Sequence, residues 1–148
     1  MKAITYLQFD GRAEEALAFY EKALLATKVK MVRFGDFGQD PITEEEQNMI
    51  MESRIEFSGN MLMISDVPPF MQAATGEITN GNTVLISIID ADPEINKQCF
   101  DGLSEGGTVI MPISSTPWSA SFGILVDKFG IMWKFNSEAS KFLDGYVG

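Results

Sequence analysis

The alternation of apolar and polar residues gives the same order of elements twice, and this repetition constrains the fold more than any other feature of the chain. In the first half the pattern predicts a strand, an amphipathic helix and three further strands, at residues 4–9, 13–25, 29–34, 49–57 and 61–65. In the second half it predicts the same order, at 83–89, 93–105, 108–113, 121–127 and 130–136. With 148 residues, the length of one ordinary domain, the two halves are expected to be modules of a single fold.

The expected fold is of the α+β class, with paired βαβββ modules forming a cupped mixed sheet. A single helix covers only one face of each module's sheet, so two modules placed side by side would form a cavity, which is the natural place for function. Within this single domain, the expected parts are module one at about 1–66, a linker at 67–81, module two at about 82–137 and a C-terminal tail at 138–148.

Two segments lack the periodicity of a helix or a strand. Residues 35–48, GDFGQDPITEEEQN, are expected to form a polar, acidic surface loop. Residues 67–81, VPPFMQAATGEITNG, are too rich in proline, glycine and small polar residues for a regular element. This second segment carries Phe70 and Met71 after two prolines, so it is expected either to act as a lid or dimer contact or only to link the modules.

The charge and hydropathy of the chain limit its partners. The net charge is −10, with 11 Lys and Arg scattered among 21 Asp and Glu, whereas phosphate contacts need clustered cations. We therefore expect no nucleic-acid partner. No apolar run approaches the roughly 18 residues of a membrane span, and the N-terminus turns acidic before a signal-type segment could develop. The expectation is a soluble, cytoplasmic protein without a membrane partner.

Histidine is absent from the sequence, which removes Ser-His and Cys-His nucleophilic catalysis and the commonest ligand of zinc, nickel and iron. The single cysteine, Cys99, excludes an internal disulfide and a Cys-based metal site. Its helical spacing with Ile95 and Leu103 predicts a buried core thiol. Any metal bound by this chain alone would need carboxylates and neutral oxygens.

The segment 49–57 predicts a strand with two different faces. One face carries Met51, Ser53, Ile55 and Phe57, and the other carries Ile50, Glu52, Arg54 and Glu56. Three charged residues on one face indicate exposure to water or a polar cleft. A desolvated carboxylate there could act as a general base, but no second residue for acid–base work is evident. Asp127, at the start of a hairpin turn, is expected to serve that turn.

The closing hairpin, SFGILVDKFGIMWKFN at 121–136, raises a question because a strand this apolar contains Lys134. The alternation places Lys134 on the same face as Met132, with Trp133 on the other. Three aromatic residues, Trp118, Phe122 and Trp133, flank this end of module two, where they are expected either to line a ligand pocket or to pack in the sheet core.

Four blocks of sequence together resemble the PhnB-like branch of the vicinal oxygen chelate superfamily, which includes glyoxalases, bleomycin-resistance proteins and extradiol dioxygenases. The blocks are TYLQFDGRAEEALAFYEKAL, IMESRIEFSGNMLMISD, FDGLSEGGTVIMP and WSASFGILVDKFGIMWKFN, and the resemblance covers nearly the whole chain. Its most specific parts are GGTVIMP and FGILVDKFGIMW. The resemblance implies paired βαβββ modules, a metal or ligand cavity in the cupped sheet and a homodimer. Some members carry a ubiquinone methyltransferase label, which is a name rather than evidence of chemistry.

In the metal-using members, His, Glu or Gln side chains on the first, middle and last strands hold a divalent ion, and this chain departs from that pattern. By the resemblance, Glu52 and Thr83 stand at two histidine positions, and Lys134 stands at the usual glutamate position. In the first strand Thr5 stands at the ligand position, and Gln8 is the only nearby residue with ligand character.

A lysine at a ligand position would repel a divalent ion. One hypothesis is that Lys134 pairs with Glu52 across the cavity floor and replaces metal coordination, since a buried ion pair is tolerated when its geometry is good. The alternative is that Lys134 extends its ammonium past the sheet rim into water.

The sequence therefore favours a protein that binds a small organic molecule in the sheet cavity without a cofactor or a tightly held metal. The alternative is a glyoxalase- or dioxygenase-type enzyme, acting as a lyase, isomerase or dioxygenase with a weakly bound divalent metal at Glu52 and Gln8. A purely structural partner protein would have a filled cavity, which the polar face of the 49–57 strand disfavours. The predicted ligand-pocket residues are Gln8, Glu52, Arg54, Trp118, Phe122, Trp133 and Lys134.

Overall fold

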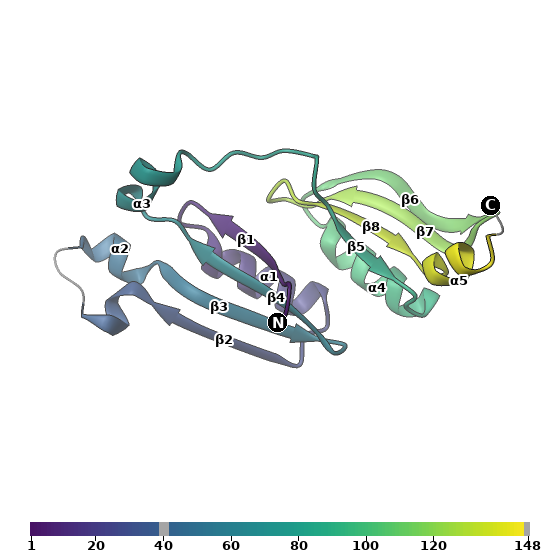
Figure 1. The fold of residues 1–148 in the computed structure, drawn as a ribbon, viewed down its shortest axis with the longest axis horizontal. Helices are drawn as coiled ribbons and strands as arrows, with labels where there is room; N and C mark the ends of the chain where they lie inside the picture. Colours follow the sequence, from purple (N-terminus) through teal and green to yellow (C-terminus); the bar gives the residue numbers. More distant parts are fainter. Residues whose placement is uncertain (39–41, 147–148) are drawn as a thin grey trace. The chain divides into compact units, whose positions relative to one another are not determined.

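The computed structural model describes residues 1–38 and 42–146 and divides the chain into two compact units, Met1–Thr79 and Asn80–Gly148, here called unit 1 and unit 2. Each unit contains a four-stranded sheet and one long helix in the order strand, helix, strand, strand, strand (Figure 1). The predicted α+β class and the repeated βαβββ order are confirmed.

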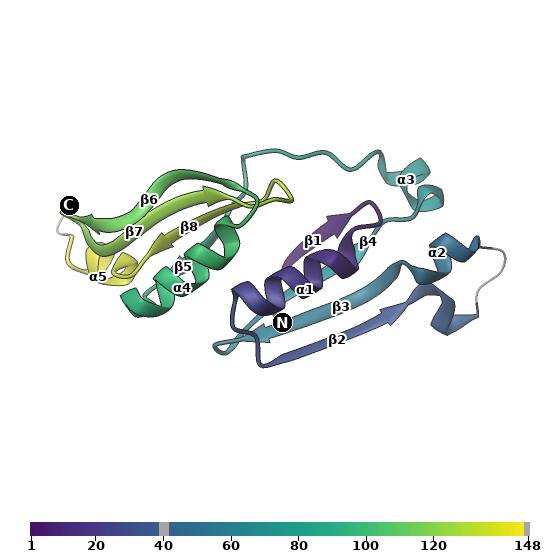
Figure 2. The ribbon, with the colours of Figure 1, turned by 180° about the vertical axis from the view of Figure 1, so that it is seen from behind.

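Unit 1 builds its sheet in the order β1-β4-β3-β2. Its main elements are β1 (Thr5–Phe9), α1 (Ala13–Ala23), β2 (Lys28–Arg33), β3 (Ile50–Phe57) and β4 (Asn60–Asp66). The first strand is parallel to β4, and the other neighbours are antiparallel. Because α1 buries one side of its surface, including Leu17 and Tyr20, against the sheet, it covers one face and leaves the other open (Figure 2).

Unit 2 repeats this topology in the order β5-β8-β7-β6. Its main elements are β5 (Ile86–Ile89), α4 (Pro93–Ser104), β6 (Thr108–Thr116), β7 (Ser119–Val126) and β8 (Met132–Asn136). The N-terminus of α4 is capped by the Asp92 side chain, which accepts a hydrogen bond from the Glu94 backbone N–H. The buried side of α4 includes Cys99 and Leu103, which confirms the core thiol, but Ile95, which the helical spacing placed on the same face, is exposed.

The structure contains four short helices that the sequence did not predict, and three of them lie in the two segments predicted to be irregular, so those two predictions were wrong. They are η1 (Phe34–Phe37) and α2 (Glu44–Asn48) in the expected acidic loop, α3 (Pro69–Thr75) in the expected linker and α5 (Ala139–Asp144) in the expected tail. Local capping supports two of them, since Thr43 caps α2 and Pro69 lies at the start of α3. Residues 39–41 of the predicted loop and 147–148 of the tail lie outside the described residues. In the described part of the chain, no helix is long and apolar enough to cross a membrane.

The strands of unit 2 also differ from the prediction at their ends. The first strand begins at Ile86 instead of residue 83. Only a tight turn separates the strands predicted at 108–113 and 121–127, because β6 continues to Thr116, which pairs with Ser119. The Thr116 hydroxyl also accepts a hydrogen bond from the Ser119 backbone N–H and so closes the turn.

Candidate functional site

The open face of unit 1 carries the charged residues of β3. Glu52, Arg54 and Glu56 alternate with the buried Ser53 and Ile55, as the sequence predicted. The same prediction placed Ile50 with the charged residues, and this was wrong because Ile50 is fully buried. The β2–β3 register shifts between Val32 and Arg33, so the strict alternation is broken at this end of β3.

Glu52 has a partner that sequence reasoning missed. The Tyr6 hydroxyl on β1 donates a hydrogen bond of 2.6 Å to Oε1 of Glu52 on β3. Burial raises the pKa of Tyr6, the hydrogen bond to Glu52 and the Glu52 charge raise it further, and a hydrogen bond with Ser65 acts in the opposite direction. The alternation in TYLQF places Tyr6 on the same face of β1 as Gln8, but it does not show that this face lies near Glu52.

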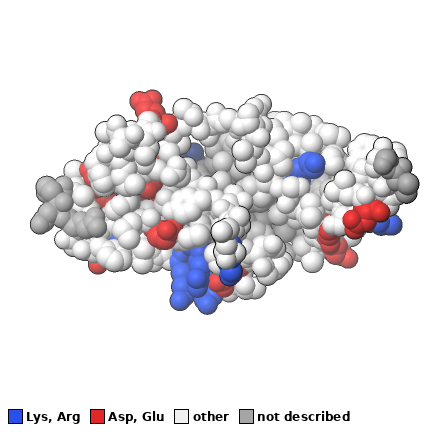
Figure 3. Space-filling view, viewed as in Figure 1, with Lys and Arg blue, Asp and Glu red and all other residues white. Residues whose placement is uncertain are grey.

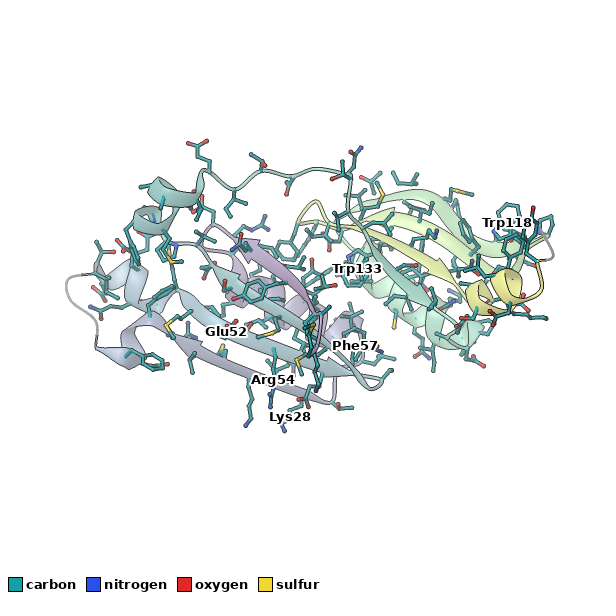
Figure 4. The ribbon with its side chains drawn as sticks, in the orientation of Figure 1. Lys28, Glu52, Arg54, Phe57, Trp118 and Trp133 are labelled. Carbon is teal, nitrogen blue, oxygen red and sulfur yellow. The ribbon has the colours of Figure 1, made fainter. Side chains whose placement is uncertain are left out.

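A cavity of about 610 Å³ lies on unit 1 beside these residues. Its lining comes from residues 29–32 of β2, residues 52–54 of β3 and Met63 of β4. Two predicted site residues, Glu52 and Arg54, therefore line one cavity (Figure 4). Gln8 is exposed on β1, where it pairs with Ser65, and it is not among the residues that line this cavity.

A second cavity, of about 540 Å³, lies on the open face of unit 2. Lys134 of β8 and Phe122 of β7 contribute to it from the sheet, and Trp118 contributes from the turn between β6 and β7. The rings of Trp118 and Phe122 meet edge to face, with centroids 5.6 Å apart. On the other side, Phe142 and Leu143 of α5 complete an apolar wall. Three of the predicted ligand-pocket residues therefore line one cavity, and the helix α5, which was not predicted, lines it as well.

Among the described residues that line this cavity, Lys134 is the only cation, and its side chain is half-buried. Within the described ranges, no carboxylate lies in ion-pair contact with its ammonium. The neighbouring residues on the sheet are Ser87 of β5 and Ile124 of β7. The pairing of Lys134 with Glu52 stays a prediction, since the two residues belong to different units and each unit is described by itself.

Trp133, which the sequence also suggested for a ligand pocket, lies in the core of unit 2. Its side chain is 0% exposed, and its indole N–H donates a hydrogen bond of 2.9 Å to Oδ2 of Asp127. Figure 4 places Trp133 and Trp118 at opposite ends of unit 2. Asp127 also accepts hydrogen bonds from the backbone N–H groups of Phe129 and Ile131, so its expected role in the turn is confirmed.

The donor groups in either unit do not fit a tightly held transition metal. Among the described residues, no three or more His, Cys, Asp or Glu side chains are grouped so that they could hold a metal ion. Glu52 is already engaged by the Tyr6 hydroxyl, and the last strand presents the ammonium of Lys134 in place of a donor.

Comparison with known proteins identifies relatives over most of the chain. A family model described as 3-demethylubiquinone-9 3-methyltransferase matches residues 1–136. Protein YjdN of Escherichia coli (strain K12) is 28% identical over 141 residues, which cover 88% of this chain and 91% of YjdN. The crystal structure of protein PA1353 from Pseudomonas aeruginosa is 30% identical, covers 92% of this chain and 96% of its own, and superposes with a TM-score of 0.74.

A third relative shares the fold at lower identity. It is a putative 3-demethylubiquinone-9 3-methyltransferase, PhnB protein, from Bacillus cereus, which is 24% identical and has a TM-score of 0.68. The similarity covers 92% of this chain and 98% of that protein. The three relatives therefore match this chain over nearly its whole length and theirs.

Proposed function

Because the chain belongs to the 3-demethylubiquinone-9 3-methyltransferase family, we propose that it is a PhnB-like protein of the vicinal oxygen chelate superfamily and that it binds a small organic molecule. The family description names a methyltransferase, but we infer no methyl transfer from it. Nucleotide-type cofactors commonly bind at a doubly wound parallel sheet with a glycine-rich loop, and each unit here is a mixed sheet with one long helix. The proposed function is therefore binding, without a tightly held metal.

The observation that carries the proposal is the cavity of unit 2. Its walls include the aromatic residues Trp118, Phe122 and Phe142 and the aliphatic Leu143. Lys134 supplies one ammonium. A half-buried charge without a counter-charge is unfavourable, whereas a bound anion would compensate it. The volume of about 540 Å³ falls within the usual range for small-molecule sites. The cavity thus suits an organic molecule with an apolar body and one negatively charged group.

The experiment measures binding of benzoate and 1-naphthoate, and of the corresponding neutral amides, by calorimetry and tryptophan fluorescence. We expect both carboxylates to bind. Lys134→Met should weaken their affinity about tenfold or more, which corresponds to the loss of one charge-assisted contact. Lys141→Met is the matched control, because Lys141 lies on α5 outside this cavity and already pairs with Glu138 at 2.9 Å. Equal binding of acids and amides, or an unchanged affinity in Lys134→Met, would contradict the proposal.

A second candidate function is a lyase, isomerase or dioxygenase that uses a weakly held divalent ion. One observation favours it: Gln8 of β1 and Glu52 of β3 both offer oxygen atoms on the open face of unit 1, where each is exposed. Elemental analysis and calorimetric titration of untagged protein with zinc, nickel, manganese and iron(II) test it. Stoichiometric, tight binding that Glu52→Gln abolishes would favour the enzyme, and no binding would favour the metal-free carrier.

A further inference from the structure

Two cations lie directly opposite each other on the open face of unit 1. Lys30 of β2 pairs in register with Arg54 of β3, and both line the cavity of about 610 Å³. Directly opposed side chains in an antiparallel pair lie about 5 Å apart at Cβ, and like charges there are destabilising. Figure 3 shows blue side chains gathered over this part of unit 1, although the net charge of the chain is −10. The fold alone gives no reason for such a pair.

Among the described residues, neither nearby carboxylate, Glu52 or Glu56, forms a hydrogen bond with Lys30 or Arg54. Glu52 accepts its hydrogen bond from Tyr6. Glu56 lies 3.3 Å from Nε of Arg54, yet this buried Nε forms no hydrogen bond with any described residue. The contact is therefore an ion pair whose N–H is not aligned with the carboxylate. In the part of the chain that the structure describes, the Arg54 terminal nitrogens and the Lys30 ammonium have no hydrogen bond either.

The rest of the lining fits a small organic molecule. Val32 and Met63 present apolar side chains beside the two cations, on the same face of the sheet by register. Arginine binds phosphate through two parallel N–H groups, and lysine binds it as a point charge. A phosphate monoester carries about −1.5 to −2 at pH 7, and its several oxygens can contact the Arg54 guanidinium and the Lys30 ammonium at the same time.

From this juxtaposition we propose that Lys30 and Arg54 form an anion site that binds the phosphate group of a small phosphate monoester, with Val32 and Met63 contacting its organic part. The negative net charge of the chain disfavours anions at long range, so binding depends on these local contacts. This site belongs to unit 1 and does not rest on the proposed role of Lys134 in unit 2.

The test is a calorimetric titration of the full chain with inorganic phosphate and phenyl phosphate at constant ionic strength. We expect saturable binding of one phosphate per chain. Lys30→Gln and Arg54→Gln should each weaken phosphate binding about tenfold or more. Arg54→Lys should weaken it less, because lysine keeps the positive charge and loses only the paired N–H donors of the guanidinium. The matched control is Lys28→Gln, on the same strand and face but opposite Glu56 and outside the cavity lining, with less than a twofold change.

Three results would overturn the proposal: no saturable binding to the wild type, an equal loss in Lys28→Gln, or benzoate binding as tightly as phenyl phosphate. A second measurement needs no variant. Phosphate should shift the backbone amide resonances of residues 30–32 and 52–54, and shifts confined to other residues would refute the site. The Lys134→Met variant should bind phosphate as tightly as the wild type. The phosphate site of unit 1 and the proposed carboxylate site of unit 2 can therefore fail independently of each other.

Discussion

The hydroxyl of Tyr6 has a raised pKa, and the direction of the shift fixes its effect on stability. The folded protein holds the Tyr6 proton more tightly than the unfolded chain, in which tyrosine ionises near pH 10, at about its unperturbed value. The contribution of this shift to stability is therefore fully present below about pH 10. It is lost as the pH rises through the folded-state pKa.

Replacing Glu52 tests the origin of this shift. Glu52→Gln should lower the Tyr6 pKa only part of the way to its ordinary value, because burial, the largest cause, remains. The measurement is a pH titration of phenolate absorbance, in which Tyr6→Phe identifies the Tyr6 transition. Glu56→Gln is the control, since Glu56 lies on the same face and is not the partner of Tyr6. An unchanged titration in Glu52→Gln, or an equal shift in the control, would show that Glu52 does not act on Tyr6.

These side chains also show how far the sequence could predict the site. Alternation along β8 was enough to place Lys134 and Trp133 on opposite faces of the sheet, since neighbouring residues of a strand point in opposite directions. The contact of Tyr6 with Glu52 could not be predicted in this way. It depends on β4 lying between β1 and β3, which is a long-range pairing without a local signal.

The turn between β7 and β8 depends on one buried carboxylate. Asp127 accepts hydrogen bonds from two backbone N–H groups of the turn and from the indole of Trp133. Asp127→Ala leaves these donors without their acceptor and should destabilise unit 2 by about 3 kcal/mol. Urea unfolding followed by tryptophan fluorescence measures this, because both tryptophans belong to unit 2. Asp144→Ala, at an exposed position in α5, should change stability by less than about 0.5 kcal/mol.

A milder change at the same turn separates the indole contact from the backbone contacts. Trp133→Phe keeps an aromatic ring in the core and removes one donor, so it should cost about 1–2 kcal/mol, less than Asp127→Ala. If Trp133→Phe cost as much as Asp127→Ala, the turn would depend on the indole rather than on the backbone hydrogen bonds.

The elements predicted well are those whose own periodicity is long enough to be recognised. The helices α1 and α4, with 11 and 12 residues, show a full amphipathic pattern. The missed helices have 4 to 7 residues, which is too short for a repeat. Single side-chain contacts help to form these short helices. In α3, for example, the Gln72 side-chain amide donates hydrogen bonds to the Val67 carbonyl and to the Asp10 carboxylate. Only the structure shows such contacts, and α5 is the missed helix that completes a cavity.

The repeated topology leaves each unit with one covered and one open sheet face, and unit 2 also exposes an edge. The strand β6 is last in the sheet order and carries three exposed apolar residues in succession, Val109, Ile110 and Met111. An apolar edge strand of this kind is a pairing surface, because its backbone groups and side chains are left without partners on one side. We propose that this edge contributes to a homodimer.

Sedimentation equilibrium should then give twice the 16.4 kDa mass of one chain. Ile110→Lys places a charge on the exposed edge and should shift the equilibrium towards the monomer about tenfold or more, since it replaces apolar contact with a desolvation cost. Ile95→Lys is the matched control, because Ile95 is exposed to a similar degree but lies on α4 away from the edge strand. A wild type that stays monomeric at all concentrations would refute the dimer. A dimer that Ile110→Lys leaves intact would place its interface elsewhere than β6.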